Sequence, residues 1–234
     1  MQARYPGLNT DFLGEQSFTR KDNQPDKKFY SASRLVHHLD SRARSIVRNI
    51  HDTYVKNRES FLDLMASWDS HLSEAFQQSM VTVLGMNMAE LKANPIADDR
   101  LVQEINENPI LPFREKSFAG IICTSSVEYL TKPMEVFHEI ARVLKPGGIC
   151  VMTFSNRWFP PKVVSIWQEL YDFERLGLVI DYFLKTQSFG EITTVSYRGW
   201  PKPQDDKYYG SFPFSDLIYA VIAEKNNDRC PEWH

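Results

Sequence analysis

The sequence predicts an α/β fold, a seven-stranded, mostly parallel sheet with an antiparallel last strand and helices on both faces. Two observations predict it. Short apolar runs that read as strands alternate with segments that show the 3.6-residue period of helices. Two strand-like runs then follow each other without an intervening helix, and such neighbours pair in antiparallel fashion. Strands that alternate with helices form right-handed crossovers, and therefore a mostly parallel sheet.

The first helix is expected to begin at Ser31 or Ser33, either of which is a good N-cap, and to reach Tyr54. A helix that starts at Pro133 is ended by the Pro-Gly-Gly turn after Lys145. The other expected helices span 71–79, 88–93 and 160–183. The expected strands span 61–64, 81–84, 101–102, 118–123, 149–154, 192–197 and 217–223.

The length of 234 residues, with 42% hydrophobic residues, suits a single domain. Residues 1–29 contain prolines and glycines and are expected to form an extended N-terminal arm or loose loop. Residues 30–226 are expected to form the domain, including an N-terminal cap helix, and residues 227–234 a C-terminal tail.

The composition indicates which classes of binding partner are expected. The net charge is -3 and the charges are spread along the chain, which does not favour a nucleic-acid or anionic-membrane partner. The three cysteines have no spacing typical of a disulfide framework, and no metal site is predicted. A reducing compartment, the cytoplasm or an organelle stroma, agrees with this cysteine usage. The expected partner is a small-molecule substrate, with no nucleic acid and no membrane, and a homodimer is left open.

Two motifs carry a resemblance to a known family. Leu111-Pro112-Phe113, followed by Lys116-Ser117-Phe118, leads into the fourth strand, and the run "RVLKPGG" at 142–148 leads into the fifth. In this order they resemble the class I S-adenosylmethionine-dependent methyltransferases, type 11 group, over roughly residues 30–224. The resemblance implies a Rossmann-like fold, S-adenosylmethionine as the cofactor, and methyl transfer to a small-molecule acceptor.

The expected cofactor loop departs from the family pattern. The family has an acidic residue and then G-x-G-x-G after strand one; here Asp63 matches the acid, but Met65, Ser67 and Asp69 replace the glycines. Glycine permits positive φ and a close backbone approach to the ligand. We expect the serine hydroxyls and the backbone amides at a following helix N-terminus to bind the cofactor carboxylate. The cofactor contacts expected from this segment are Asp63, Met65, Ala66 and Ser67.

Further cofactor contacts are expected where the next strands end, because ligands of open parallel sheets lie there. Asn87 replaces the acid that takes the ribose hydroxyls; its amide can accept and donate, but asparagine is also an ordinary turn residue. Met88 is expected beside the adenine, or else in the core. Glu104 and Asn106 are expected at the adenine amino group, or else in an exposed loop. Ser125 is expected to face the transferred methyl group.

The acceptor side follows from the same edge of the sheet. Arg157 suits a carboxylate or phosphate of the substrate, although a structural salt bridge is the alternative. The expected substrate contacts are Tyr30, Ser126, Asn156 and Arg157. The expected bases are His37, Tyr129 and His71. Tyr129 would need a lowered pKa for this role, and a substrate contact or a structural tyrosine is the alternative. The aromatic loop from Trp200 to Tyr209 is a candidate cover for the cleft.

Three functions are considered. The first is an enzyme, an S-adenosylmethionine-dependent methyltransferase that acts on a small molecule. The alternative is a degenerate methyltransferase-fold protein that acts as a non-catalytic binding or scaffolding module, which the missing glycines favour. A nicotinamide-dependent oxidoreductase is disfavoured, because no G-x-G-x-x-G follows the first strand.

Overall fold

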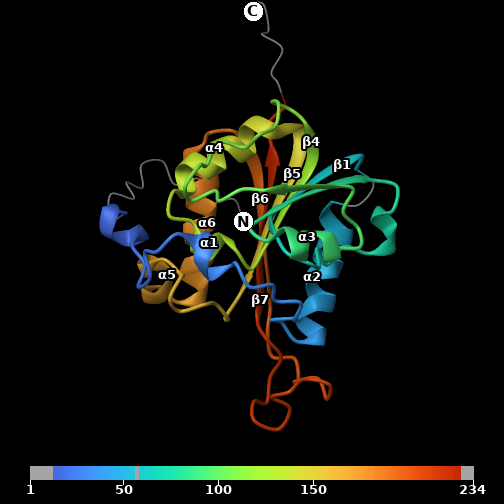
Figure 1. Ribbon diagram of the computed structural model, residues 1–234, viewed down its shortest axis with the longest axis vertical. Coiled ribbons are helices and arrows are strands. Elements are labelled where there is room, and N and C mark those ends of the chain that lie inside the picture. Colours follow the sequence, from blue (N-terminus) through green and yellow to red (C-terminus); the bar gives the residue numbers. More distant parts are fainter. Residues whose placement is uncertain (1–12, 56–57, 228–234) are drawn as a thin grey trace, which may run out of the picture.

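The computed structural model describes residues 13–55 and 58–227 of the chain (Figure 1). It contains one seven-stranded sheet in the order β3-β2-β1-β4-β5-β7-β6. β7 is antiparallel to both β5 and β6, and the other neighbouring pairs are parallel. The predicted fold class is confirmed. The strands are β1 (Ser60–Ala66), β2 (Met80–Gly85), β3 (Asp99–Val102), β4 (Phe118–Thr124), β5 (Leu144–Ser155), β6 (Phe189–Tyr197) and β7 (Ile218–Lys225).

Helices cover both faces of the sheet, with α2 and α3 on one face and α4, α5 and α6 on the other (Figure 1). Each face has its own apolar cluster, one containing Val47 and Ile50, the other Phe137 and Trp167. None of the helices within the described ranges has the length and apolar composition needed to cross a bilayer. The α-helices are α1 (Asp26–Phe29), α2 (Ser41–Tyr54), α3 (Met88–Ala93), α4 (Pro133–Val143), α5 (Ser165–Glu169) and α6 (Asp172–Lys185), and the 3-10 turns are η1 (Glu15–Phe18), η2 (Glu74–Phe76) and η3 (Val127–Tyr129).

The first helix begins later than predicted. α2 starts at Ser41, because the carboxylate of Asp40, rather than Ser31 or Ser33, accepts the N-terminal hydrogen bond, from the amide of Ala43 at 2.8 Å. Asp40 is buried, and the Nζ of Lys202 lies 3.1 Å from its carboxylate. Residues 31–39 are therefore irregular, and His37 and His38 are not on a helix.

The helix predicted at 71–79 is wrong. Only the short turn η2 lies between β1 and β2, because His71 adopts a left-handed φ of 52° and its amide donates to the carboxylate of Asp69 at 2.8 Å. The expected carboxylate site at a helix N-terminus after β1 is thus not formed. The predicted long helix after Pro160 is two helices, α5 and α6. Between β3 and β4 there is no helix within the described residues.

The described part of the N-terminal arm, residues 13–29, is packed rather than loose. Asp26 is buried and lies 2.9 Å from a nitrogen of Arg20 and 3.1 Å from the Nζ of Lys162, which is fully buried. The amide of Asp26 donates to Glu104 at 2.9 Å, which fixes the arm at the end of β3. Residues 1–12 of the arm and nearly all of the predicted tail at 227–234 lie outside the described residues.

Candidate functional site

A cleft opens at the carboxyl end of the parallel strands, where ligands of this class of sheet bind. The ends of β1, β2, β3 and β4 line it, together with residues from the segment before α2. Of the predicted cofactor contacts, those that line the cleft are Asp63, Met65, Ala66, Ser67, Asn87, Glu104, Asn106 and Ser125, whereas Met88 does not. Tyr30, Ser126, His37, His71 and Tyr129 also line it, whereas Asn156 and Arg157 do not.

The segment after β1 keeps a glycine-like conformation without glycine. Met65 has a φ of 60° and forms a bulge between Leu64 and Ala66 in the pairing with β2. Ala66 pairs with Gly85, and a Cβ at Gly85 would lie 2.2 Å from the carbonyl oxygen of Ala66. The close approach that the family builds with glycine after β1 is thus supported here by a glycine at the end of β2.

Strained backbone gathers at this cleft. Five non-glycine residues in the described ranges have a positive φ, and three of them, Met65, His71 and Ser125, line the cleft. Each left-handed non-glycine residue costs about 1–2 kcal/mol and persists where surrounding structure holds it. Ser125, for example, has a φ of 49°, and its amide donates to the carbonyl of Thr153 at 2.7 Å.

Side chains from α3 and its C-terminus fix the loop. The hydroxyl of Ser67 donates to Glu90 at 2.6 Å. The side-chain amide of Asn94 donates to the carbonyl of Ser67 at 3.0 Å and to the hydroxyl of Ser70 at 2.8 Å. These bonds use the polar groups that were expected to bind the cofactor carboxylate, so the loop is ordered without a helix behind it.

Asp63 lies within β1, where burial raises its pKa to about 7. The hydroxyl of Ser70 favours the ionised form of Asp63, and the nearby charge of Asp69 disfavours it. Near neutral pH the side chain is therefore divided between its protonated and ionised forms.

Asp69 lies between two histidines. Its carboxylate is 3.0 Å from Nδ1 of His71 and 3.6 Å from Nδ1 of His37. Burial alone would raise the pKa of Asp69, but the contacts with His71 and the charge of His37 hold it well below its usual range. The ring of His37 packs on Trp68, with centroids 4.4 Å apart.

His37 is suited to accept a proton. Burial and the charge of Arg44 lower its pKa, and the carboxylate of Asp69 opposes that shift only in part. The imidazole is therefore mainly neutral near pH 7. Within the described ranges, no group of three or more His, Cys, Asp or Glu side chains is arranged to hold a metal ion.

The side-chain amide of Asn87 already forms hydrogen bonds within the protein, so its predicted ribose contact is not supported. Its oxygen accepts from the amide of Ala89 at 3.0 Å and caps α3, and its nitrogen donates to the carbonyl of Tyr30 at 3.0 Å. The alternative interpretation, a turn residue, describes it better. Asn106 is similarly engaged, because its oxygen accepts from the amide of Thr131 at 2.8 Å and its nitrogen donates to the carbonyl of Tyr129 at 2.9 Å.

Other buried polar atoms around the cleft have no hydrogen-bond partner among the described residues. They are Oε2 of Glu104, Oγ1 of Thr124, Oγ of Ser125 and Nε of Arg44. Buried polar groups are rarely left unpaired, so these atoms suit a polar ligand. S-adenosylmethionine offers hydrogen-bond donors in its adenine amino group, ribose hydroxyls and ammonium group, and one carboxylate acceptor. The residues present therefore fit this cofactor.

Tyr129 does not have the lowered pKa that it would need to act as a base. Burial, together with the nearby Glu128, raises its pKa well above the usual value, and its hydroxyl accepts a hydrogen bond from the amide of Phe159 at 2.8 Å. Tyr129 is therefore a structural tyrosine. The hydroxyl of Ser126 donates to the carbonyl of Thr124 at 3.0 Å.

The substrate contacts predicted after β5 are wrong, because these side chains bond to the segment before β7. Arg157 lies 3.1 Å from Asp216 and its guanidinium is 5.6 Å from the ring of Tyr208. Asn156 accepts from the amide of Leu217 at 3.1 Å. The aromatic loop between β6 and β7 projects beyond the sheet (Figure 1), and its residues do not line the cleft.

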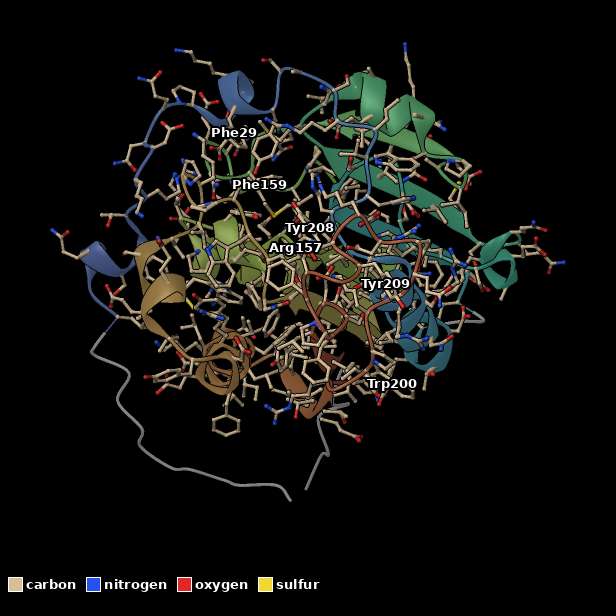
Figure 2. All side chains as sticks on the ribbon, turned by 90° about the horizontal axis from the view of Figure 1, so that it is seen from below. Phe29, Arg157, Phe159, Trp200, Tyr208 and Tyr209 are labelled. Atoms are coloured by element: carbon tan, nitrogen blue, oxygen red, sulfur yellow. The ribbon has the colours of Figure 1, made fainter. Side chains whose placement is uncertain are left out.

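Aromatic rings instead gather near the cleft around Arg34. Its guanidinium lies 4.6 Å from the ring centroid of Phe29 and 5.6 Å from that of Phe159. These two rings contact each other edge to face at 5.6 Å and are seen side by side in Figure 2. Sequence reasoning missed this group, and also Arg44, Trp68 and Glu90. No local pattern marks them, because they meet only through the fold.

Comparison with known proteins finds similarity to methyltransferases. Residues 69–152 match the family model described as "Methyltransferase domain". The ubiquinone/menaquinone biosynthesis C-methyltransferase UbiE of Laribacter hongkongensis is 24% identical over 170 residues, which cover 69% of this chain and 68% of that protein.

Solved structures share the fold. A methyltransferase from Archaeoglobus fulgidus has a TM-score of 0.55 at 14% identity, covering 78% of this chain and 94% of that one. Phosphoethanolamine N-methyltransferase 2 of Haemonchus contortus, in complex with S-adenosyl-L-methionine, has a TM-score of 0.53 at 14% identity, covering 79% of this chain and 52% of that one. The match over residues 69–152 and the shared fold confirm the resemblance to the class I methyltransferases.

Proposed function

We propose that this chain, whose fold and family match are those of a class I methyltransferase, catalyses S-adenosylmethionine-dependent methylation of a small-molecule acceptor. One observation carries the proposal: buried, unpartnered polar atoms of Glu104, Thr124 and Ser125 face one cleft at the carboxyl edge of the sheet. S-adenosylmethionine, when bound, supplies a methyl group on a positively charged sulfur. Such transfer depends mainly on alignment, which is worth up to roughly 7–11 kcal/mol.

Carboxylates of this chain replace the family's usual cofactor contacts. Glu104 has one oxygen bonded to Asp26 and the other unpartnered, so it is our candidate acceptor for the adenine amino group. Glu90, in the first turn of α3, lines the cleft, and we assign it, in place of Asn87, to the ribose hydroxyls. Its two oxygens accept from Ser67 and Arg34, and a carboxylate keeps further lone pairs for a ligand.

His37 is the base that we propose for an acceptor that must lose a proton. Its lowered pKa keeps it neutral, and Asp69 at 3.6 Å stabilises the imidazolium that forms when it takes the proton. His71 remains a second candidate because it lines the same cleft beside Asp69.

The acceptor that suits this cleft is a small, flat molecule. Tyr30 and Phe159 line the cleft, and the guanidinium of Arg34 lies over the rings of both, at 5.7 and 5.6 Å. Such a group stacks well on a conjugated or aromatic ring. The name of the relative UbiE, a C-methyltransferase of quinone biosynthesis, is in keeping with a flat acceptor.

The test is label transfer. Purified protein, S-adenosylmethionine carrying a tritiated methyl group, and a protein-free small-molecule extract of the source cells are incubated together. We expect label in a new organic product, and a rate about 100-fold lower for His37→Gln. His138→Gln is the control, because His138 is exposed on α4. Cofactor binding without any transfer would contradict the enzymatic proposal.

Two observations favour the alternative, a non-catalytic binding module. The segment after β1 has neither the glycines nor the helix of the family pattern, and the amide of Asn87 is engaged elsewhere. In that case a folded, stable protein would give no heat with S-adenosylmethionine.

A further inference from the structure

We propose that Arg44 and Asp69 bind the amino-acid end of S-adenosylmethionine, with Arg44 on its carboxylate and Asp69 on its ammonium group, in place of the glycine-rich loop. The inference rests on the proposed function and assigns one part of the cofactor to two residues. Asp69 stands where the family pattern has a glycine, and Arg44 lies outside that pattern.

Arg44 is a cation that lines the cleft, and none of the described residues pairs with its side chain. It is the fourth residue of α2, and its Nε is buried with no hydrogen bond. Within the described ranges no carboxylate lies within ion-pair distance of its guanidinium, although Asp69 lines the same cleft. A partly buried guanidinium is costly to leave unpaired, and its planar donors match a carboxylate in two-point geometry.

Asp69 supplies the opposite charge. Its oxygens already accept from the amide of His71 and lie near the imidazoles of His71 and His37, and this leaves lone pairs for another donor. Arg44 and Asp69 thus offer separate positive and negative groups in one cleft. An α-amino acid carries the complementary pair, a carboxylate and an ammonium group.

The loop itself provides little for that end of the cofactor. The carbonyl of Ser67 and the hydroxyl of Ser70 are bonded to Asn94, and no α-helix presents its amides after β1. The other cleft-lining arginine, Arg34, is engaged by the carbonyl of Phe29 at 2.9 Å and by aromatic rings. Arg44 remains the available cation beside the loop.

The test compares ligands with and without the amino-acid group. Isothermal titration calorimetry measures binding of S-adenosylmethionine, S-adenosylhomocysteine and 5′-methylthioadenosine, which lacks the amino-acid end, to the wild-type chain and to Arg44→Met. We expect Arg44→Met to weaken the first two ligands by about 10- to 100-fold, the loss typical of a charged hydrogen bond, and to leave methylthioadenosine within about twofold. Arg44→Lys should recover part of the loss, because it restores charge but not the planar fork.

Arg48→Met is the matched control, since Arg48 is exposed one turn later on α2 and does not line the cleft. Equal affinity of Arg44→Met and wild type for S-adenosylmethionine would overturn the inference, even if Arg44→Met then failed to bind a methyl acceptor. Equal weakening of all three ligands would also overturn it, by indicating a purely structural role. If the wild type binds none of the ligands, the proposed function itself fails.

Discussion

The carboxylate of Asp69 accepts the backbone amide of His71 at 2.8 Å and lies 3.0 Å from Nδ1 of the same residue. One side chain thereby holds both the main chain and the ring of His71, which explains the left-handed φ of 52° there. The turn also brings Asp69 to within 3.6 Å of His37. A segment that lacks the family's glycines thus carries an acid and a histidine to the cleft, beside His37 from the segment before α2.

Asp69→Asn tests this arrangement. The negative charge of Asp69 raises the pKa of His37 against the effects of burial and of Arg44, so its removal should lower that pKa further. Histidine NMR titration of wild type and variant measures the change. Asp99→Asn, at an exposed position on β3, should leave the His37 titration unaltered. An identical His37 titration in Asp69→Asn would show that the acid does not act on this ring.

Ser125→Gly tests whether backbone strain at the cleft serves binding. Ser125 has a φ of 49°, and glycine there should stabilise the protein by roughly 1 kcal/mol, or about 2–4 °C in Tm. Loss of its unpartnered hydroxyl should weaken S-adenosylmethionine several-fold. Thermal unfolding and calorimetry measure the two effects.

Gln187→Gly is the control, because Gln187 has a φ of 56° after α6, outside the cleft. It should give the same stabilisation with unchanged cofactor affinity. Undiminished binding by Ser125→Gly would remove Ser125 from the cofactor site.

Glu128 predicts a pH dependence of stability. Both its oxygens are buried without a partner, and burial raises its pKa from 4.5 to about 8. Between these values the unfolded chain is ionised while the folded chain keeps the proton, so stability falls as pH rises. Glu128→Gln removes this titration. Relative to the wild type, its free energy of unfolding should therefore increase by roughly 1–4 kcal/mol between pH 5 and pH 8.

Urea unfolding at the two pH values measures the difference, with Glu135→Gln on the exposed face of α4 as the control. A constant gap between Glu128→Gln and wild type across this range would mean that Glu128 is ionised in the folded protein.

Local signals predicted much of the fold. The bounds of α3 were predictable because Asn87 caps it, and Pro133 correctly marked the start of α4. The start of α2 was not predictable, because Ser31, Ser33 and Asp40 are all good N-caps. The choice of Asp40 depends on Lys202, which lies 162 residues further along the chain.

The candidate site was less predictable. Strand ends correctly brought Asp63, Glu104 and Ser125 to one cleft, since parallel strands share an edge. The hydrogen bonds that engage Asn87 and the ion pair of Arg157 with Asp216 depend on tertiary contacts, and no local pattern shows them. The role of Arg44 could not be predicted either, because the sequence of α2 does not distinguish it from an ordinary polar position.

We expect this cleft to bind S-adenosylmethionine although Met65, Ser67 and Asp69 replace the glycines. Isothermal titration calorimetry of the wild-type chain with S-adenosylmethionine and S-adenosylhomocysteine measures that binding. We expect both to bind in the micromolar range, about -8 kcal/mol. The absence of heat with either ligand, in protein shown to be folded by circular dichroism, would contradict this expectation and favour a non-catalytic binding module.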